Sequence, residues 1–235
     1  MTFPAQKLLA FDTSTETMFI ALTDGAKTWQ HTAEGGAKTS AALIPAIMNL
    51  LKEAGLTLQQ LDAIVFGRGP GSFTGLRTAC SVAQGLAFGA GNLMVLPVDT
   101  LLAVAEEARF THGATQVMAL LDARMNEVYT AAYAWQAATN MWQSQAEIAL
   151  IRPEMLQIDE SWLFAGNMPH VQVAAMPTAT AMLRLAPAML AAGLGVTAEQ
   201  ALPLYVRDKV AQTTAERENL KMQATKTIPV TESTP

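Results

Sequence analysis

The sequence "GRGPGSFTGLR" at residues 67–77 decides how the chain folds, because it joins an apolar run to a long uncharged helix. The run before it, "DAIVFGRG" at 62–69, is typical of a buried strand. Four glycines and a proline fill the loop, and Ser72 or Thr74 is placed to cap the helix that follows. Strand, glycine-rich loop and helix in this order predict an α/β fold.

The loop itself has two interpretations that the residues alone do not separate. Free backbone N–H groups at the start of a helix attract anions, and this start is surrounded by Gly69, Gly71, Ser72, Thr74 and Arg77. Neither a G-K-[ST] ending nor a G-x-G-x-x-G pattern is present, however. The alternative is a tight turn in which glycine lets another segment pass close to the backbone.

A second polar segment, "FDTST" at 11–15, ends the first predicted strand. Its carboxylate and hydroxyl groups, Asp12 and Thr13 above all, are of the kind that hold phosphate or Mg²⁺. The same side chains equally satisfy the hairpin turn in which they lie. Both interpretations remain open from the sequence.

The helix predicted at about 72–90 has two apolar faces. One is built of small residues, namely Thr78, Val82, Gly85 and Gly89, with Ser81 at its edge. The opposite face carries Leu76, Ala79, Ala83, Leu86 and Ala90. Because both faces need cover, one packs on the sheet and the other meets a second helix. That helix is either residues 39–54 of this chain or part of a partner.

The remaining pattern predicts a mixed sheet and two lobes. Strands are expected at 7–15, 17–24, 27–34 and 93–98, with helices at 39–54 and 100–110. The second half predicts two strands within 115–136 around "DARMNE", a strand at 161–167 and a helix at 178–195. In "DARMNE", Asp122, Arg124 and Glu127 are expected to form a local structural ion network. We therefore expect lobes at 1–108 and 109–210, and a frayed polar tail at 211–235.

Composition narrows the function classes. A net charge of −5 makes the chain a poor binder of nucleic acid on its own. Cys80, the single cysteine, predicts a buried inert thiol, and His31, His112 and His170 lie too far apart to suggest a metal site. The uncharged stretch 78–98 approaches the length of a membrane span, but "GAGN" interrupts it, so we expect a buried helix and strand in a cytoplasmic protein.

Five motifs occur in an order that is more specific than any one of them. They are "LLAFDTST", "GRGPGSFTGLR", "AQGLAFG", "DARMNEVY" and "LPLYVRDKVA". Together they resemble the TsaB (YeaZ) family, bacterial proteins needed to make threonylcarbamoyladenosine in tRNA. The resemblance covers nearly the whole chain, apart from the region near 136–160 and the tail.

The resemblance implies an actin-like (ASKHA, RNase H-like) α/β fold of two lobes with mixed sheets, the second smaller and degenerate. It also implies a non-catalytic scaffold, because in this family the transfer belongs to a TsaD subunit with a metal-binding histidine pair. Expected partners are a TsaD-like catalytic subunit, a TsaE-like ATPase, and a second copy when the chain is alone, with tRNA contacted only through the complex. The family's helix-on-helix contact maps onto Leu43, Ile47, Thr78, Ser81, Val82, Gly85 and Gly89.

The implied nucleotide site is incomplete in this sequence. Asp12, Thr13 and the 67–77 loop correspond to a vestigial phosphate loop, and "FAGNMPH" at 164–170 is a thin candidate for the second loop. Lys38 stands where many relatives have a histidine. We therefore expect no cofactor, with ATP or ADP bound weakly or only at an interface. The alternative is an actin-like small-molecule kinase or ATPase that uses Asp12 and the Gly67–Arg77 loop.

Overall fold

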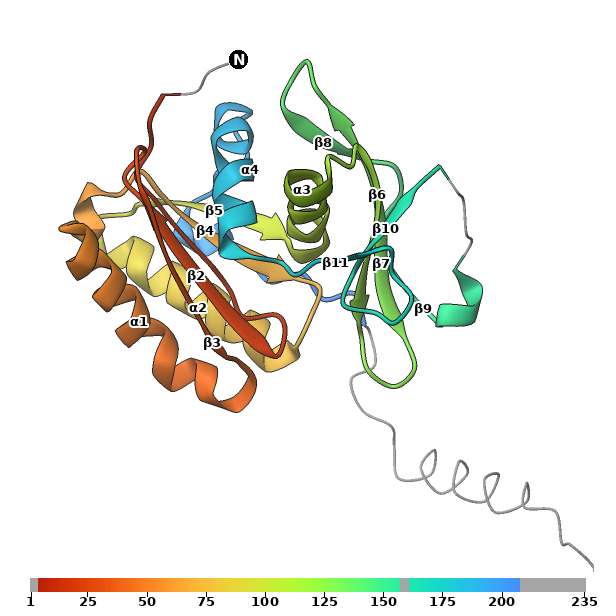
Figure 1. Cartoon of the computed structure of the whole chain (residues 1–235). Coiled ribbons are helices and arrows are strands. Elements are labelled where there is room, and N and C mark those ends of the chain that lie inside the picture. Colours follow the sequence, from red (N-terminus) through yellow and green to blue (C-terminus); the bar gives the residue numbers. More distant parts are fainter. Residues whose placement is uncertain (1–3, 157–160, 208–235) are drawn as a thin grey trace, which may run out of the picture.

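A computed structural model describes residues 4–156 and 161–207, which form two β-sheets and four α-helices stacked in layers (Figure 1). Helices α1 (Thr39–Ala54) and α2 (Phe73–Gly89) cover the outer face of the first sheet. Helices α3 (Thr100–His112) and α4 (Ala179–Ala191) lie between the two sheets. The predicted two-lobe α/β class is confirmed.

The first sheet is mixed, as predicted, with strand order β3-β2-β1-β4-β5. Its strands are β1 (Leu8–Asp12), β2 (Thr17–Thr23), β3 (Thr28–Glu34), β4 (Ala63–Gly69) and β5 (Met94–Asp99). The first three strands form an antiparallel meander, whereas β1, β4 and β5 run parallel. The parallel strands bring the 12–15 turn and the 67–77 loop to the same edge of the sheet.

The second sheet has strand order β11-β10-β6-β7-β8, with β9 also paired to β7. Its strands are β6 (Gln116–Asp122), β7 (Val128–Gln136), β8 (Met141–Ser144), β9 (Ala149–Ile151), β10 (Leu163–Gly166) and β11 (Val173–Ala174). Short 3₁₀ turns lie at Gly36–Lys38, Leu58–Gln60, Pro153–Met155 and Ala198–Gln200. The strands β6, β7 and β10 were predicted, but the shorter β8, β9 and β11 were not.

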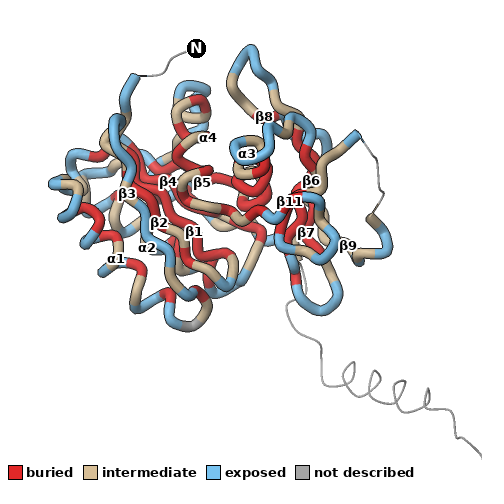
Figure 2. Tube along the Cα trace, in the orientation of Figure 1, coloured by how far each residue is buried: buried red, intermediate tan, exposed pale blue. Residues whose placement is uncertain are grey.

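The side chains of β1 point alternately to the two faces of the first sheet, and this shows how the layers are held together. Leu8 and Ala10 point into a core shared with α3 and α4, whereas Leu9 and Phe11 point into a core shared with α1 and α2. All four are buried, so both faces of the first sheet are covered (Figure 2). Burial of each large apolar side chain stabilises the fold by about 1.5–3 kcal/mol.

Helix α1 uses its apolar stripe inside the chain, which corrects one expectation. Leu43 and Ile47, expected at a partner contact, are fully buried against the first sheet. They are therefore core residues, because the apolar stripe of a surface helix faces the sheet on which the helix packs. The large apolar side chains that α1 exposes are Ile44 and Met48.

The two lobes share one core, and the predicted limit between residues 108 and 109 falls inside α3. Helix α4, from the second half of the sequence, packs on β1 and β2 as well as on α3. The buried Glu106 carboxylate of α3 accepts hydrogen bonds from Arg109 at 2.9 Å, Arg184 of α4 at 3.2 Å and Trp142 Nε1 of β8 at 3.1 Å. The predicted tail at 211–235 lies outside the described residues.

The last residues that the structure describes cross back over the first lobe. Residues 196–207, the returning segment, begin with a bridge between Val196 and Val95 at the edge of β5. The Ala201 carbonyl accepts hydrogen bonds from Cys80 Sγ and Gln84 Nε2, both at 3.0 Å. The Leu204 N–H then donates to the Arg68 carbonyl at 2.7 Å. Cys80 is buried as predicted, and burial raises the pKa of its thiol.

The 67–77 loop packs directly on the 12–15 turn, and glycine makes this packing possible. The Ser72 N–H donates to the Ser14 carbonyl at 2.8 Å, and Thr13 Oγ1 donates to the Gly75 carbonyl at 2.7 Å. A Cβ atom on Gly75 would lie 1.8 Å from the Thr13 carbonyl oxygen, and one on Gly71 would lie 2.6 Å from Ser14. The close-passage interpretation of the loop is therefore the one that the geometry supports.

Two glycines of α2 give a matched test of this packing. Gly75→Ala should lower the free energy of unfolding by about 3 kcal/mol, because the new methyl group meets rigid backbone. Gly85→Ala should instead raise it by about 1 kcal/mol, because nothing lies within 4 Å of its Cβ and alanine favours helix. Urea unfolding of both variants measures the difference, and equal stabilities would contradict the packing described.

Candidate functional site

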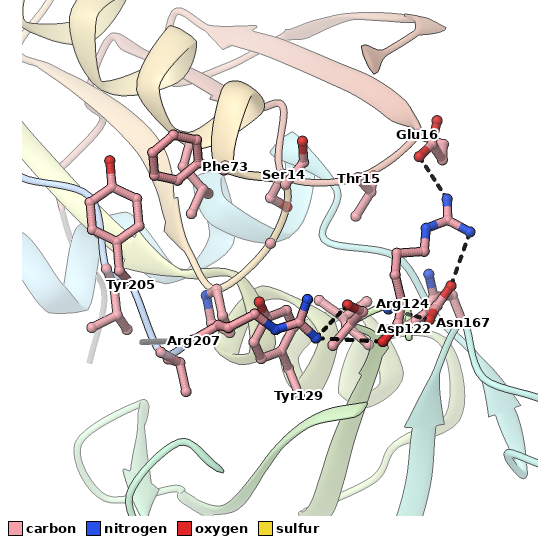
Figure 3. A pocket seen from close by; sticks show the side chains of 18 of the residues that line it. Ser14, Thr15, Glu16, Phe73, Asp122, Arg124, Tyr129, Asn167, Tyr205 and Arg207 are labelled. Atoms are coloured by element: carbon pink, nitrogen blue, oxygen red, sulfur yellow. Dashed lines mark hydrogen bonds and ion pairs between the residues drawn. The ribbon is translucent and has the colours of Figure 1, made fainter. Parts of the chain in front are cut away.

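A cleft of about 560 Å³ opens between the two lobes (Figure 3). One wall comes from the β1–β2 turn and the start of α2, and the other from the β6–β7 turn and the end of β10. Residues 204–207 of the returning segment complete it. Five segments far apart in the sequence therefore meet at one site.

The first wall carries an arginine held between aromatic rings. Phe73 and Tyr205 lie with ring centroids 5.3 Å apart. The Arg77 guanidinium sits 3.9 Å from the Phe73 centroid, and its Nε donates to the Tyr205 hydroxyl at 3.1 Å. This arrangement presents a cation and aromatic surface together at the start of α2.

The opposite wall is a turn with unusual backbone geometry. Arg124, Met125 and Asn126 all have positive φ, between 58° and 62°. This left-handed conformation costs about 1–2 kcal/mol for each such residue. The turn is anchored by Arg207, which donates to the Ala123 carbonyl at 2.8 Å and to Glu127 at 2.6 Å. The returning segment therefore fixes the shape of this wall.

The ion network at this turn is only partly local, which corrects the expectation for "DARMNE". Arg124 pairs with Asp122 at 3.2 Å and also crosses the cleft to Glu16 at 2.7 Å. Glu127 pairs with Arg207 instead. The Arg124–Glu16 pair is drawn at the right of Figure 3, and it ties the two lobes together at the cleft mouth. Both side chains are exposed, so the pair contributes at most about 1 kcal/mol.

Asp12 lies behind the cleft wall and not in the cleft, contrary to the expected phosphate or metal role. It is fully buried, and its Oδ1 accepts hydrogen bonds from the Ser14 N–H and hydroxyl at 2.8 and 2.6 Å. Its Oδ2 has no partner among the described residues and faces Gly67, where a Cβ would lie 1.8 Å away. Burial raises the pKa of Asp12 from 3.8 to about 6, although the Ser14 hydrogen bonds oppose this. Thr13 is likewise buried, with its hydroxyl bound to Gly75.

The other predicted loop residues divide between the cleft and the packing. Gly71, Ser72 and Arg77 line the cleft, and Ser72 caps α2 by accepting from the Gly75 N–H at 3.5 Å. Gly69 has φ +120° and packs against the Leu204 carbonyl, and Thr74 is exposed outside the cleft. Of "FAGNMPH", Asn167 reaches the cleft, where its Oδ1 accepts from the Asp122 N–H at 2.8 Å.

Sequence reasoning missed further residues that the fold brings to the cleft. These are Glu16, Tyr129, Tyr205 and Arg207. Tyr129 stands in "DARMNEVY", and Tyr205 and Arg207 stand in "LPLYVRDKVA", so the ordered motifs contained them. No spacing rule marks them, because they come from strand and coil segments that meet only in the folded chain.

The small-residue face of α2 points away from the chain's own core. Ser81, Gly85 and Gly89 are exposed, and Thr78 and Val82 are half-buried. Nothing lies within 4 Å of a Cβ built on Gly85 or Gly89. The helix α1 therefore does not cover this face, although it packs elsewhere on α2.

In residues 4–156 and 161–207, no three His, Cys, Asp or Glu side chains gather in a way that could hold a metal ion. None of the helices in these ranges has the length and apolar character to cross a membrane.

Comparison with known proteins identifies the family. A family model for TsaD, tRNA N6-adenosine threonylcarbamoyltransferase, matches residues 29–230. The Escherichia coli K12 tRNA threonylcarbamoyladenosine biosynthesis protein TsaB is 34% identical over 224 residues, covering 87% of this chain and 96% of that protein. The chain belongs to the TsaB family. A TsaB from Haemophilus influenzae is 36% identical over 225 residues, covering 86% of this chain and 94% of that protein.

Solved structures agree with the family assignment. YeaZ from Pseudomonas aeruginosa superposes with a TM-score of 0.76 at 38% identity, covering 85% of this chain and 99% of that structure. A second structure, described as similar to peptidase YeaZ from the same organism, gives a TM-score of 0.78. The two-lobe architecture around the cleft is thus the architecture of TsaB relatives.

The enclosed Asp12 predicts a specific dependence of stability on pH. The folded chain keeps a proton on Asp12 up to about pH 6, whereas the unfolded chain releases it near 3.8. The contribution of Asp12 to the free energy of unfolding should therefore increase as pH falls from about 7 to about 4, by at most about 3 kcal/mol. Asp12→Asn should remove this component. Urea unfolding across this pH range measures it, with the exposed Asp62→Asn as control, and an unchanged pH dependence in Asp12→Asn would contradict the assignment.

Proposed function

We propose that this chain is the non-catalytic scaffold subunit for threonylcarbamoyl transfer to the adenosine next to the anticodon of tRNA. Its relatives are named tRNA threonylcarbamoyladenosine biosynthesis protein TsaB, and the family model that the chain matches is that of the transferase TsaD. In this proposal the chain acts in the cytoplasm, docks on a TsaD-like catalytic subunit and helps to recruit a TsaE-like ATPase. When alone it pairs with a second copy.

The observation that carries the proposal is the open face of α2. Ser81, Gly85 and Gly89 allow a partner helix to approach closely, because no large side chain keeps the backbones apart. Large apolar side chains of the same two outer helices are also exposed: Ile44 and Met48 of α1 are 45% and 47% exposed, and Phe88 of α2 is 71% exposed. Exposed apolar groups beside a flat helix face are typical of a protein interface.

Two features support a non-catalytic role without a cofactor of its own. The buried Asp12 carboxylate cannot reach a ligand in the cleft, which weakens the kinase or ATPase alternative. The lining arginines Arg124 and Arg207 are already paired with carboxylates, so Arg77 is left to meet the several negative charges of a nucleotide. ATP or ADP would then bind weakly or only at the interface with the partner. The acidic chain would contact tRNA through the complex.

Reconstituted tRNA modification tests the role directly. Catalytic subunit and ATPase should modify tRNA at the full rate only when this chain is added, because the complex needs its docking surface. The product is measured as threonylcarbamoyladenosine in digested tRNA. Full modification without the chain would overturn the proposal.

A charge on the open face tests the surface. Gly85→Glu should abolish association with the catalytic subunit and lower tRNA modification to the level seen without the chain, because a partner helix would bury an unpaired carboxylate. Thr111→Glu, an equally exposed helix position on α3, should leave both unchanged. Circular dichroism of each variant checks that the chain remains folded. Unimpaired association of a folded Gly85→Glu chain would place the interface elsewhere.

A further inference from the structure

The Tyr129 hydroxyl on the floor of the cleft lacks a partner. Tyr129 is only 7% exposed, it lines the cleft, and no described residue hydrogen-bonds to its hydroxyl (Figure 3). Burial raises the pKa of this phenol, so it remains an O–H donor at neutral pH. The hydroxyl is not among the fully buried unpaired atoms, so it opens to the cleft and can donate to a ligand acceptor there.

The start of α2 offers further donors to the same cleft. Ser72 satisfies the Gly75 and Leu76 N–H groups through its hydroxyl and carbonyl oxygens. The Phe73 and Thr74 N–H groups have no acceptor among the described residues, and Phe73 lines the cleft. Unpaired N–H groups at a helix N-terminus favour a negatively charged ligand group.

The charges around the cleft limit how negative that group can be. Arg124 is neutralised by Glu16 and Asp122, and Arg207 by Glu127. Arg77 is the lining arginine that has no carboxylate partner in the described chain, because it contacts only Phe73 and Tyr205. One negative charge therefore has a counter-ion here, whereas the several charges of a polyphosphate would exceed what Arg77 can pair.

The rest of the cleft suits an apolar body. The Phe73 and Tyr205 rings and the Leu76 and Leu121 side chains line it. Its volume of about 560 Å³ lies within the range of small-molecule sites, about 300–1,000 Å³. The cleft thus combines apolar surface with a few donors, as binding sites for small ligands do.

We propose that the cleft binds a small organic monocarboxylate that carries a second acceptor oxygen on an apolar body. The carboxylate lies toward Arg77 and the start of α2, and the second oxygen accepts from Tyr129. The planar Arg77 guanidinium matches a carboxylate better than a point charge would. This proposal is independent of the scaffold role, because it concerns the cleft and not the open face of α2.

N-acetyl-leucine is a suitable probe, because it has one carboxylate, an amide carbonyl and an apolar side chain. Calorimetric titration should detect binding, and amide NMR should show shifts at Phe73 and Thr74. Its uncharged analogue N-acetyl-leucinamide should bind about tenfold more weakly or worse, because it cannot pair with Arg77. N-acetyl-phenylalanine and N-acetyl-alanine extend the series to larger and smaller bodies.

Matched variants separate the site from general effects. Tyr129→Phe and Arg77→Gln should each weaken N-acetyl-leucine binding by about tenfold. Tyr133→Phe should not, because that hydroxyl also lacks a partner but lies in the core outside the cleft. Arg152→Gln should not either, because Arg152 is exposed and does not line the cleft.

Three outcomes would overturn the proposal. The first is that none of the three acids binds. The second is that the acid and its amide bind equally, or that the Tyr129 and Arg77 variants bind as well as the parent chain. The third is that ATP or inorganic phosphate binds more tightly than the acids and depends on the same two side chains, which would make the cleft a phosphate site.

Discussion

The close contact between the 67–77 loop and the 12–15 turn is the constraint on which the rest of the structure depends. Gly67, Gly71 and Gly75 recur every four residues, and each leaves room for a different atom of that turn. This packing encloses the Asp12 carboxylate and sets where α2 begins. The wall of the cleft and the direction of the open helix face both follow from it.

The two lobes of this chain are joined in a way that fixes the geometry of the cleft between them. The exposed Arg124–Glu16 pair across the cleft is weak by itself. The stronger connection is the shared apolar core around α3 and α4, reinforced by the buried Glu106 carboxylate and its three donors. The lobes are therefore not two bodies on a flexible hinge, and a cleft of this kind can recognise a ligand without closing on it.

Regular patterns made the helices and central strands predictable, because apolar periodicity reports local burial. The helix predicted at 39–54 is α1, and that at 72–90 is α2 within one residue at each end. Periodicity does not say what covers an apolar stripe, and the family resemblance placed Leu43 and Ile47 at a partner contact, whereas they lie in the core.

The cleft was less predictable, because distant segments build it. Ser14, Tyr129 and Tyr205 meet only through tertiary packing. The burial of Asp12 depended on whether a glycine on the neighbouring strand would lie against it, and the register of the strands decides this.

The returning segment has a further consequence for synthesis of the chain. It caps the edge of β5 and binds the end of β4, so the lobe that is made first is completed by residues that are made much later. On the ribosome, the N-terminal lobe must wait with an open sheet edge until residues 196–207 have emerged, so its final folding step follows translation of most of the chain.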